Sequence, residues 1–212
     1  MELDRISLAK RFWNNIFGDD MDFLDRYFDT YYKEDGLIIS HSDNKVRYMT
    51  LLIDYNYKYY DSIIPIVYLT GLATSPELRG QGLMRENMSK VFDRIKEKNI
   101  PIAVLIPAND WLKEAYLKYG FIDVFTSTPP PNNHKSITHC PETYKLYKDL
   151  GYDITKLENH SKGMLKIMDR DYVVKLYNQY HKSHSIPLDS LSDEDLTRLV
   201  FEDSFMNLMF DV

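Results

Sequence analysis

A basic, glycine-rich turn lies between an apolar run and an amphipathic segment in the first half of the chain. The run and the turn read Ile66-Val-Tyr-Leu-Thr-Gly-Leu-Ala-Thr-Ser-Pro-Glu-Leu-Arg-Gly-Gln-Gly-Leu83. A strand that ends in Arg79-Gly80-Gln81-Gly82, directly before a helix, brings backbone N–H groups, a cation and a helix N-terminus together, and these groups bind a pyrophosphate. The turn has neither the GxxxxGK[ST] pattern of a Walker loop nor a complete GxGxxG fingerprint. The sequence therefore predicts a phosphate-binding turn of another kind.

The segments on either side of the turn must position it. Residues 65–74 are apolar and β-branched, as expected of a buried strand, and Gly71 within them indicates a bulge or the close approach of another backbone. After the turn an apolar stripe recurs at helical spacing, and residues 102–106 form a second buried strand. A strand, a helix and a parallel strand make a βαβ unit with the turn at its functional end. The stripe consists of Met84, Met88, Val91, Phe92 and Ile95.

The flanking sequence predicts more helices and strands. Apolar residues at helical spacing indicate a helix that ends at Gly18, and Asp19 and Asp20 can cap a second helix. Residues 37–53 read as a β-hairpin, and residues 112–119 as a short helix that stops at Gly120. The tyrosine-rich residues 54–60 are either an exposed connection or strand extension, the interpretation we favour, or a wall of an acceptor pocket.

Composition limits the classes of function. The chain has 212 residues, 44% of them hydrophobic, and a net charge of −6. These values are typical of a globular protein of one domain, or one domain with an extension, and the charge argues against binding to nucleic acid or to an anionic membrane. No segment predicts a signal peptide or a membrane span, so we expect a cytoplasmic protein. The single cysteine, Cys140, excludes an internal disulfide, and no His or Cys group has the spacing of a metal site, so no metal is expected.

The chain resembles the GCN5-related N-acetyltransferases, the GNAT family, over roughly residues 1–126. Two leading helices, the strand ending Gly-Leu-Ala-Thr-Ser-Pro-Glu-Leu, the loop Arg79-Gly-Gln-Gly-Leu83 and the segment Ala115-Tyr-Leu-Lys-Tyr-Gly-Phe121 occur in the family's order. The loop resembles the family's acetyl-CoA signature, Arg/Gln-x-x-Gly-x-Gly/Ala, and the last segment resembles its Tyr-x-x-x-Gly-Phe signature. Met84 departs from the pattern because it replaces the final Gly or Ala of the loop.

The departure at Met84 points to a subgroup that resembles the enhanced intracellular survival proteins. The loops of that subgroup continue Gly-Leu-Leu/Met-Arg, and this chain has Gly82-Leu-Met-Arg85 at the same place. Residues 163–169 and 196–201 look like the two ends of that subgroup's sterol-carrier-like domain, without its middle. The resemblance therefore implies a GNAT-like acetyl-CoA-binding core at 1–126. Residues 127–212 would be a C-terminal segment that completes or packs on the core, as a remnant of the sterol-carrier-like domain.

The resemblance implies an α/β (α+β) fold with a mixed, mostly antiparallel sheet, flanking helices and splayed central parallel strands. It also implies acetyl-CoA as cosubstrate. Backbone groups of Leu72, Ala73 and Thr74 would pair with the pantetheine. Amides of the turn and the positive end of the following helix would hold the pyrophosphate, with Arg79 adding charge. The implied cofactor-binding residues are Leu72, Ala73, Thr74, Arg79, Gly80, Gln81, Gly82, Leu83 and Met84.

The same resemblance implies an N-acetyltransferase in which a primary amine, on a small molecule or a peptide, attacks the thioester directly. The N–H near Leu72 would polarise the carbonyl, and Tyr116 would act as general acid, with Tyr119 as the competing candidate. The strand carries no Asp or Glu, so the base implied by the subgroup is the carboxylate of Val212, with Asp211 as fallback. A surface-packed terminus is the alternative for Val212.

A second hypothesis belongs to another class of protein. Met84 and the short C-terminal region also fit a noncatalytic acyl-CoA-binding or regulatory module. The sequence does not choose the acceptor, and since oligomers are common in the family a homo-oligomer is compatible with the resemblance.

Overall fold

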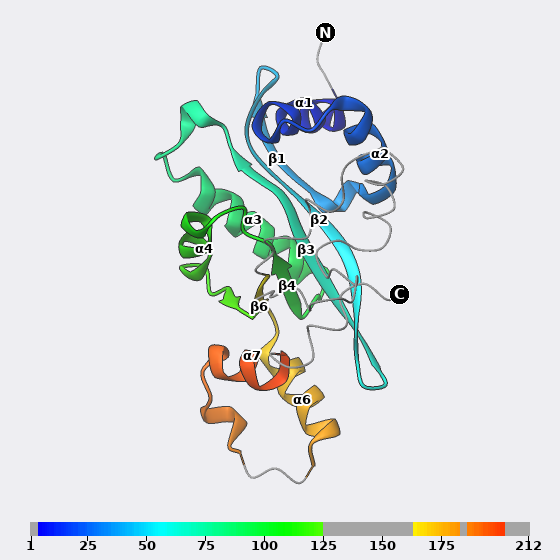
Figure 1. Cartoon of the computed structure of the whole chain (residues 1–212), viewed down its shortest axis with the longest axis vertical. Coiled ribbons are helices and arrows are strands. Elements are labelled where there is room, and N and C mark those ends of the chain that lie inside the picture. Colours follow the sequence, from blue (N-terminus) through cyan, green and yellow to red (C-terminus); the bar gives the residue numbers. More distant parts are fainter. Residues whose placement is uncertain (1–3, 125–162, 183–185, 202–212) are drawn as a thin grey trace, which may run out of the picture. The chain divides into compact units, whose positions relative to one another are not determined.

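The computed structural model describes residues 4–124, 163–182 and 186–201. Within them, six strands form one sheet in the order β1-β2-β3-β4-β6-β5 (Figure 1). The pairs β1–β2, β4–β6 and β5–β6 are antiparallel, and helices flank the sheet. This confirms the predicted mixed α/β class with a mostly antiparallel sheet. The strands are β1 (Leu37–Ser42), β2 (Lys45–Tyr59), β3 (Ser62–Thr74), β4 (Ile102–Leu105), β5 (Ile122–Asp123) and β6 (Met164–Ile167).

The chain divides into two compact units. The first contains residues 1–53 and 69–94, and the second contains residues 54–68 and 95–212. The division falls within β2 and β3, so each long strand contributes to both units. The helices are α1 (Arg5–Phe17), α2 (Met21–Tyr31), α3 (Leu83–Glu97), α4 (Asp110–Leu117), α6 (Arg170–Tyr180) and α7 (Asp193–Phe201), with short 3₁₀ turns η1 (Glu34–Gly36), η2 (Pro76–Leu78) and η4 (Leu188–Ser190).

Helix α1 ends and helix α2 begins where the sequence predicts. Asp20 caps α2 by accepting a hydrogen bond from the Phe23 N–H at 2.8 Å. Gly18 ends α1 in the left-handed region, at φ 82°, and donates its N–H to Asn14 O at 2.9 Å. A side-chain cap and a left-handed glycine satisfy helix-end groups that would otherwise lack partners.

Strand β3 places Gly71 directly against α1. Gly71 has φ +57°, and a Cβ built there would lie 2.7 Å from Cε3 of Trp13. The close approach expected at this glycine therefore exists, but its partner is an indole ring and not another backbone. Because Trp13 is buried and donates its Nε1–H to Asp19 at 2.8 Å, this contact fixes α1 on the strand that leads to the glycine turn.

The hairpin strands are longer than the sequence suggests. Strand β2 continues through the tyrosine-rich segment to Tyr59, and β3 already starts at Ser62. The favoured interpretation of a strand extension is therefore right, but Tyr57 and Tyr59 are buried and not exposed. They pack in the core of the second unit, where Phe201 of α7 lies edge-on to both rings.

The second unit completes its part of the sheet with a late segment of the chain. Strand β6 lies between β4 and β5 and pairs Val104 and Ile122 with Leu165. Helices α6 and α7 follow β6 (Figure 1), and Ser192 caps α7 by accepting from the Asp195 N–H at 3.1 Å. Within the described residues, no helix has both the length and the apolar character needed to cross a bilayer.

Candidate active site

The last residues of β3 approach the turn with a regular backbone. Ala73 is buried, while Leu72 and Thr74 are half-buried. The next residue, Ser75, donates its N–H to Arg47 O of β2 at 2.9 Å, so the hydrogen bonding to β2 extends past the end of the strand. The backbone of residues 72–74 is therefore held in an extended form, which is the form needed to pair with an extended ligand.

The turn itself depends on two glycines in the left-handed region. After η2, Gly80 has φ +79° and Gly82 has φ +80°, a conformation that costs other residues about 1–2 kcal/mol. Apart from the adjacent residues of the chain, no heavy atom of the described residues lies within 4 Å of a Cβ built at either glycine. The backbone is thus open on the side where a side chain would stand, and Arg79 and Gln81 beside it are exposed.

Helix α3 starts immediately after Gly82. The Gly82 carbonyl accepts the N–H groups of Arg85 at 3.0 Å and Glu86 at 3.2 Å. Leu83 is buried and Met84 half-buried at the first two helical positions. The N–H groups of a first helical turn have no partner within the helix, so this end of α3 offers donors and the positive end of the helix dipole.

Polar contacts fix α3 against β2. Buried Asn87 donates to Met49 O at 3.1 Å and to Thr50 Oγ1 at 2.9 Å. Glu86 accepts from the Tyr48 hydroxyl at 2.8 Å, and this hydrogen bond is the main reason that the pKa of Glu86 is lowered, ahead of Arg47 and Lys90. These hydrogen bonds hold the start of α3 against β2, directly after the turn. All nine residues predicted to bind the cofactor lie in the first unit.

Tyr116 belongs to the second unit, on α4. It is 5% exposed, and its ring lies edge-on to Phe121 with centroids 6.1 Å apart. Burial, with a smaller contribution from Tyr68, raises the pKa of Tyr116 to about 12, so the phenol stays protonated at neutral pH. Tyr119, the competing candidate, is half-buried.

Two further predictions concern the base at the C-terminus and the absence of a metal site. Val212 and Asp211 lie outside the described residues. Among the described residues, no group of three or more His, Cys, Asp or Glu side chains is placed to hold a metal ion.

A family comparison decides the family of this chain. Residues 1–122, more than half of the chain, match the model described as an acetyltransferase (GNAT) domain. The chain belongs to the GNAT family. The match ends close to the boundary at residue 126 that the sequence signatures suggest, and no curated protein sequence matches the chain.

Solved structures share the GNAT fold. A GCN5-related N-acetyltransferase from Anabaena variabilis has a TM-score of 0.50 and 20% identity, over 58% of this chain and 31% of that one. A GNAT acetyltransferase from Staphylococcus aureus has a TM-score of 0.50 and 14% identity, over 80% of this chain and 98% of that one. A protein from Pyrococcus horikoshii has a TM-score of 0.52 and 15% identity, over 80% and 95%. The chain thus spans less than a third of the length of the Anabaena protein.

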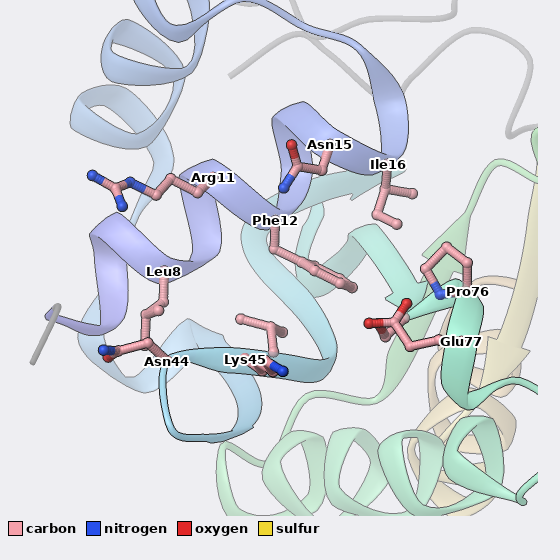
Figure 2. A pocket seen from close by; sticks show the side chains of 11 residues that line it. Leu8, Arg11, Phe12, Asn15, Ile16, Asn44, Lys45, Pro76 and Glu77 are labelled. Carbon is pink, nitrogen blue, oxygen red and sulfur yellow. The ribbon is translucent and has the colours of Figure 1, made fainter.

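Sequence reasoning missed one feature of the GNAT domain. A cavity of about 700 Å³ lies between α1, the β1–β2 turn and residues 75–77, and Lys45 and Glu77 are among its lining residues (Figure 2). No motif marks these two residues, because Lys45 is simply the first residue of β2 and Glu77 lies in the short 3₁₀ turn η2, where charged side chains are common. The hydrogen bond from the Ser75 N–H to Arg47 O brings the start of β2 and residues 75–77 together.

Proposed function

We propose that the protein is an acetyl-CoA-dependent N-acetyltransferase that acetylates a primary amine on a small molecule or a peptide. The observation that carries this proposal is the turn between β3 and α3. Two left-handed glycines there leave the backbone open beside a helix N-terminus, in a domain that belongs to the GNAT family.

The residues of the turn fit acetyl-CoA. The open space at Gly80 and Gly82 leaves room for a pyrophosphate against the backbone, and Arg79 is exposed beside it. In this proposal the amides of residues 80–84, including those of Gln81, Leu83 and Met84, donate to the phosphate oxygens. Residues Leu72, Ala73 and Thr74 hydrogen-bond the pantetheine through their backbone. Bound acetyl-CoA supplies a thioester that an amine can attack directly.

The N–H near Leu72 would donate to the thioester carbonyl oxygen, where negative charge develops. Tyr116 would donate a hydrogen bond to the departing sulfur. A phenol of pKa about 12 is a much weaker acid than a thiol, whose pKa is about 8.5, so complete proton transfer to the thiolate is uphill. Tyr116 would therefore contribute mainly as a hydrogen-bond donor that is always protonated.

The proposed base is the carboxylate of Val212, with Asp211 as the fallback, and it is supported by the resemblance to the survival-protein subgroup. The loop Gly82-Leu-Met-Arg85 also supports that subgroup. We further propose a catalytic core at 1–126 completed by residues 127–212, since β6 from the later segment pairs with β4 and β5. The resemblance alone supports the sterol-carrier-like remnant.

Thermal unfolding in the presence of acetyl-CoA tests the proposal, with adenosine diphosphate as the control ligand. Ligand at about 100 times its Kd stabilises a fold by about 2.7 kcal/mol, which raises the Tm of a chain of this size by roughly 5–10 °C. A saturable rise specific to acetyl-CoA is expected, and Arg79→Ala should reduce it. No rise in Tm at millimolar acetyl-CoA would contradict the proposed function.

A second measurement separates an enzyme from the noncatalytic alternative. Release of free CoA is followed with a panel of primary amines, including aminoglycosides, polyamines and peptides. Amine-dependent release supports the enzyme. Saturable acetyl-CoA binding without release on any amine would favour the regulatory module.

A further inference from the structure

The residues that line the cavity beside α1 all belong to the first unit. Its volume of about 700 Å³ lies within the range of small-molecule sites, which is about 300–1,000 Å³. Phe12 and Ile16 of α1 line one side, and Lys45 and Glu77 line the other (Figure 2). Apolar side chains of α1 therefore lie across the cavity from two charged side chains.

The apolar wall is a single stripe of α1. Leu8, Phe12 and Ile16 are spaced four residues apart, so they lie on one face of the helix. Leu8 and Phe12 are buried, and Ile16 is half-buried. Arg11 and Asn15 of the same helix also line the cavity, so the aliphatic and aromatic surface that the stripe offers a ligand is flanked by polar side chains.

The charged wall carries one charge of each sign. A hydrogen bond from its own backbone N–H lowers the pKa of Glu77 most, followed by the Ser75 hydroxyl and the positive charge of Lys45. Glu77 is therefore ionised at neutral pH, and Lys45 is close enough to act on it electrostatically. A ligand at this wall meets a carboxylate and an ammonium group together.

Hydrogen bonding holds together the backbone segments that carry the two charged residues, whose side chains are exposed. Ser75, two residues before Glu77, is 4% exposed and donates its N–H to the carbonyl oxygen of Arg47, two residues after Lys45. This hydrogen bond ties residues 75–77 to the start of β2. On the other side of the cavity, helix α1 is held in place by Trp13, which packs on Gly71 of β3. A preformed site loses less conformational entropy on binding than a site that must be ordered.

We propose that this cavity binds a free amino acid with a large apolar side chain. The ammonium group of the ligand would pair with Glu77, its carboxylate with Lys45, and its side chain would lie along Phe12 and Ile16. A phosphate would meet the Glu77 carboxylate, and a fatty acyl chain would leave two charges without partners, so both fit less well. The cavity shares no lining residue with the turn at residues 79–84, and the inference does not depend on the proposed function.

Protein-observed NMR titration of the full chain with L-phenylalanine, without acetyl-CoA, tests the inference. We expect saturable shifts of amides in α1 and residues 75–77 with a Kd of about 1 mM or lower, which corresponds to about −4 kcal/mol. N-acetyl-L-phenylalanine amide has the same ring without either charge, and it should bind about five times more weakly or worse.

Charge variants show which wall recognises the ligand. Glu77→Gln and Lys45→Met should each weaken L-phenylalanine binding about three- to tenfold and leave binding of the uncharged analogue unchanged. Asp29→Asn, an exposed charge change on α2 outside the cavity, is the matched control and should change neither. No saturable shift up to about 10 mM, equal binding of both ligands, or unchanged affinity in both charge variants would overturn the inference.

Discussion

The first unit contains left-handed glycines in two different settings. At Gly71 the indole of Trp13 occupies the space of a side chain, whereas at Gly80 and Gly82 no described atom comes within 4 Å of that space. All three have positive φ values between +57° and +80°. In the strand, the left-handed glycine therefore allows the Trp13 ring to pack closely. In the turn, the same backbone conformation leaves space that a ligand could occupy. A glycine motif indicates a binding site only where the space beside it is open.

The largest expected effect is the loss of stability in Gly71→Ala. The new methyl group would meet the indole of Trp13, which cannot move easily because Phe17, Tyr27 and Phe28 pack around it. Overpacking costs about 1–3 kcal/mol and the left-handed backbone about 1–2 more, so urea unfolding should show a loss of about 3 kcal/mol.

Gly18→Ala is the matched control for this variant. Gly18 has φ +82°, and no described heavy atom lies within 4 Å of its built Cβ. It should therefore lose only the backbone part, about 1 kcal/mol. Equal losses in the two variants would mean that the contact with Trp13 is not what requires a glycine in β3.

The same contrast explains what could be predicted from sequence. The end of α1 at Gly18, the cap at Asp20 and the turn before α3 depend on neighbours within a few residues, and the sequence predicted all three. The side chain that packs on Gly71 belongs to Trp13 of α1, and the sequence indicated only a bulge or a close approach at this glycine. Tyr57 and Tyr59 looked exposed because Phe201, which covers them, comes more than a hundred residues later. The position of β6 and the cavity charges at Lys45 and Glu77 likewise depend on contacts between distant segments.

The second unit offers a matched pair of its own in Tyr116 and Tyr119. Tyr116 is buried and Tyr119 is half-buried. If Tyr116 is the donor to the leaving sulfur, Tyr116→Phe should lower kcat about 100-fold, equivalent to about 2.7 kcal/mol, with the acetyl-CoA Kd nearly unchanged. Tyr119→Phe should leave kcat close to its original value. The opposite pattern in amine-dependent CoA release would assign the acid to Tyr119.

Alkaline pH separates the burial of Tyr116 from its role in catalysis. The folded pKa of about 12 lies above the unfolded value of about 10, so its stabilisation is complete below pH 10 and is lost as pH rises through 12. Two pKa units correspond to an upper value of about 2.7 kcal/mol, and we expect about 2. Urea unfolding at pH 9–12 should therefore show a shallower decline in Tyr116→Phe than in the original protein. Tyr32, whose pKa burial also raises to about 12, is present in both proteins and cancels in the difference.

The smallest effect on stability, and the clearest test of the open turn, is expected in Gly82→Ala. The space beside Gly82 is open, so only the left-handed backbone should cost stability, about 1 kcal/mol, as in Gly18→Ala. A methyl group in that space, however, would stand where the pyrophosphate is proposed to approach the amides. Isothermal titration should therefore show acetyl-CoA binding weakened about tenfold or more, equivalent to 1.4 kcal/mol, while Gly18→Ala binds normally. If the two variants lose equal stability and both retain full affinity, the open space at Gly82 belongs to a turn alone, and the pyrophosphate must bind elsewhere.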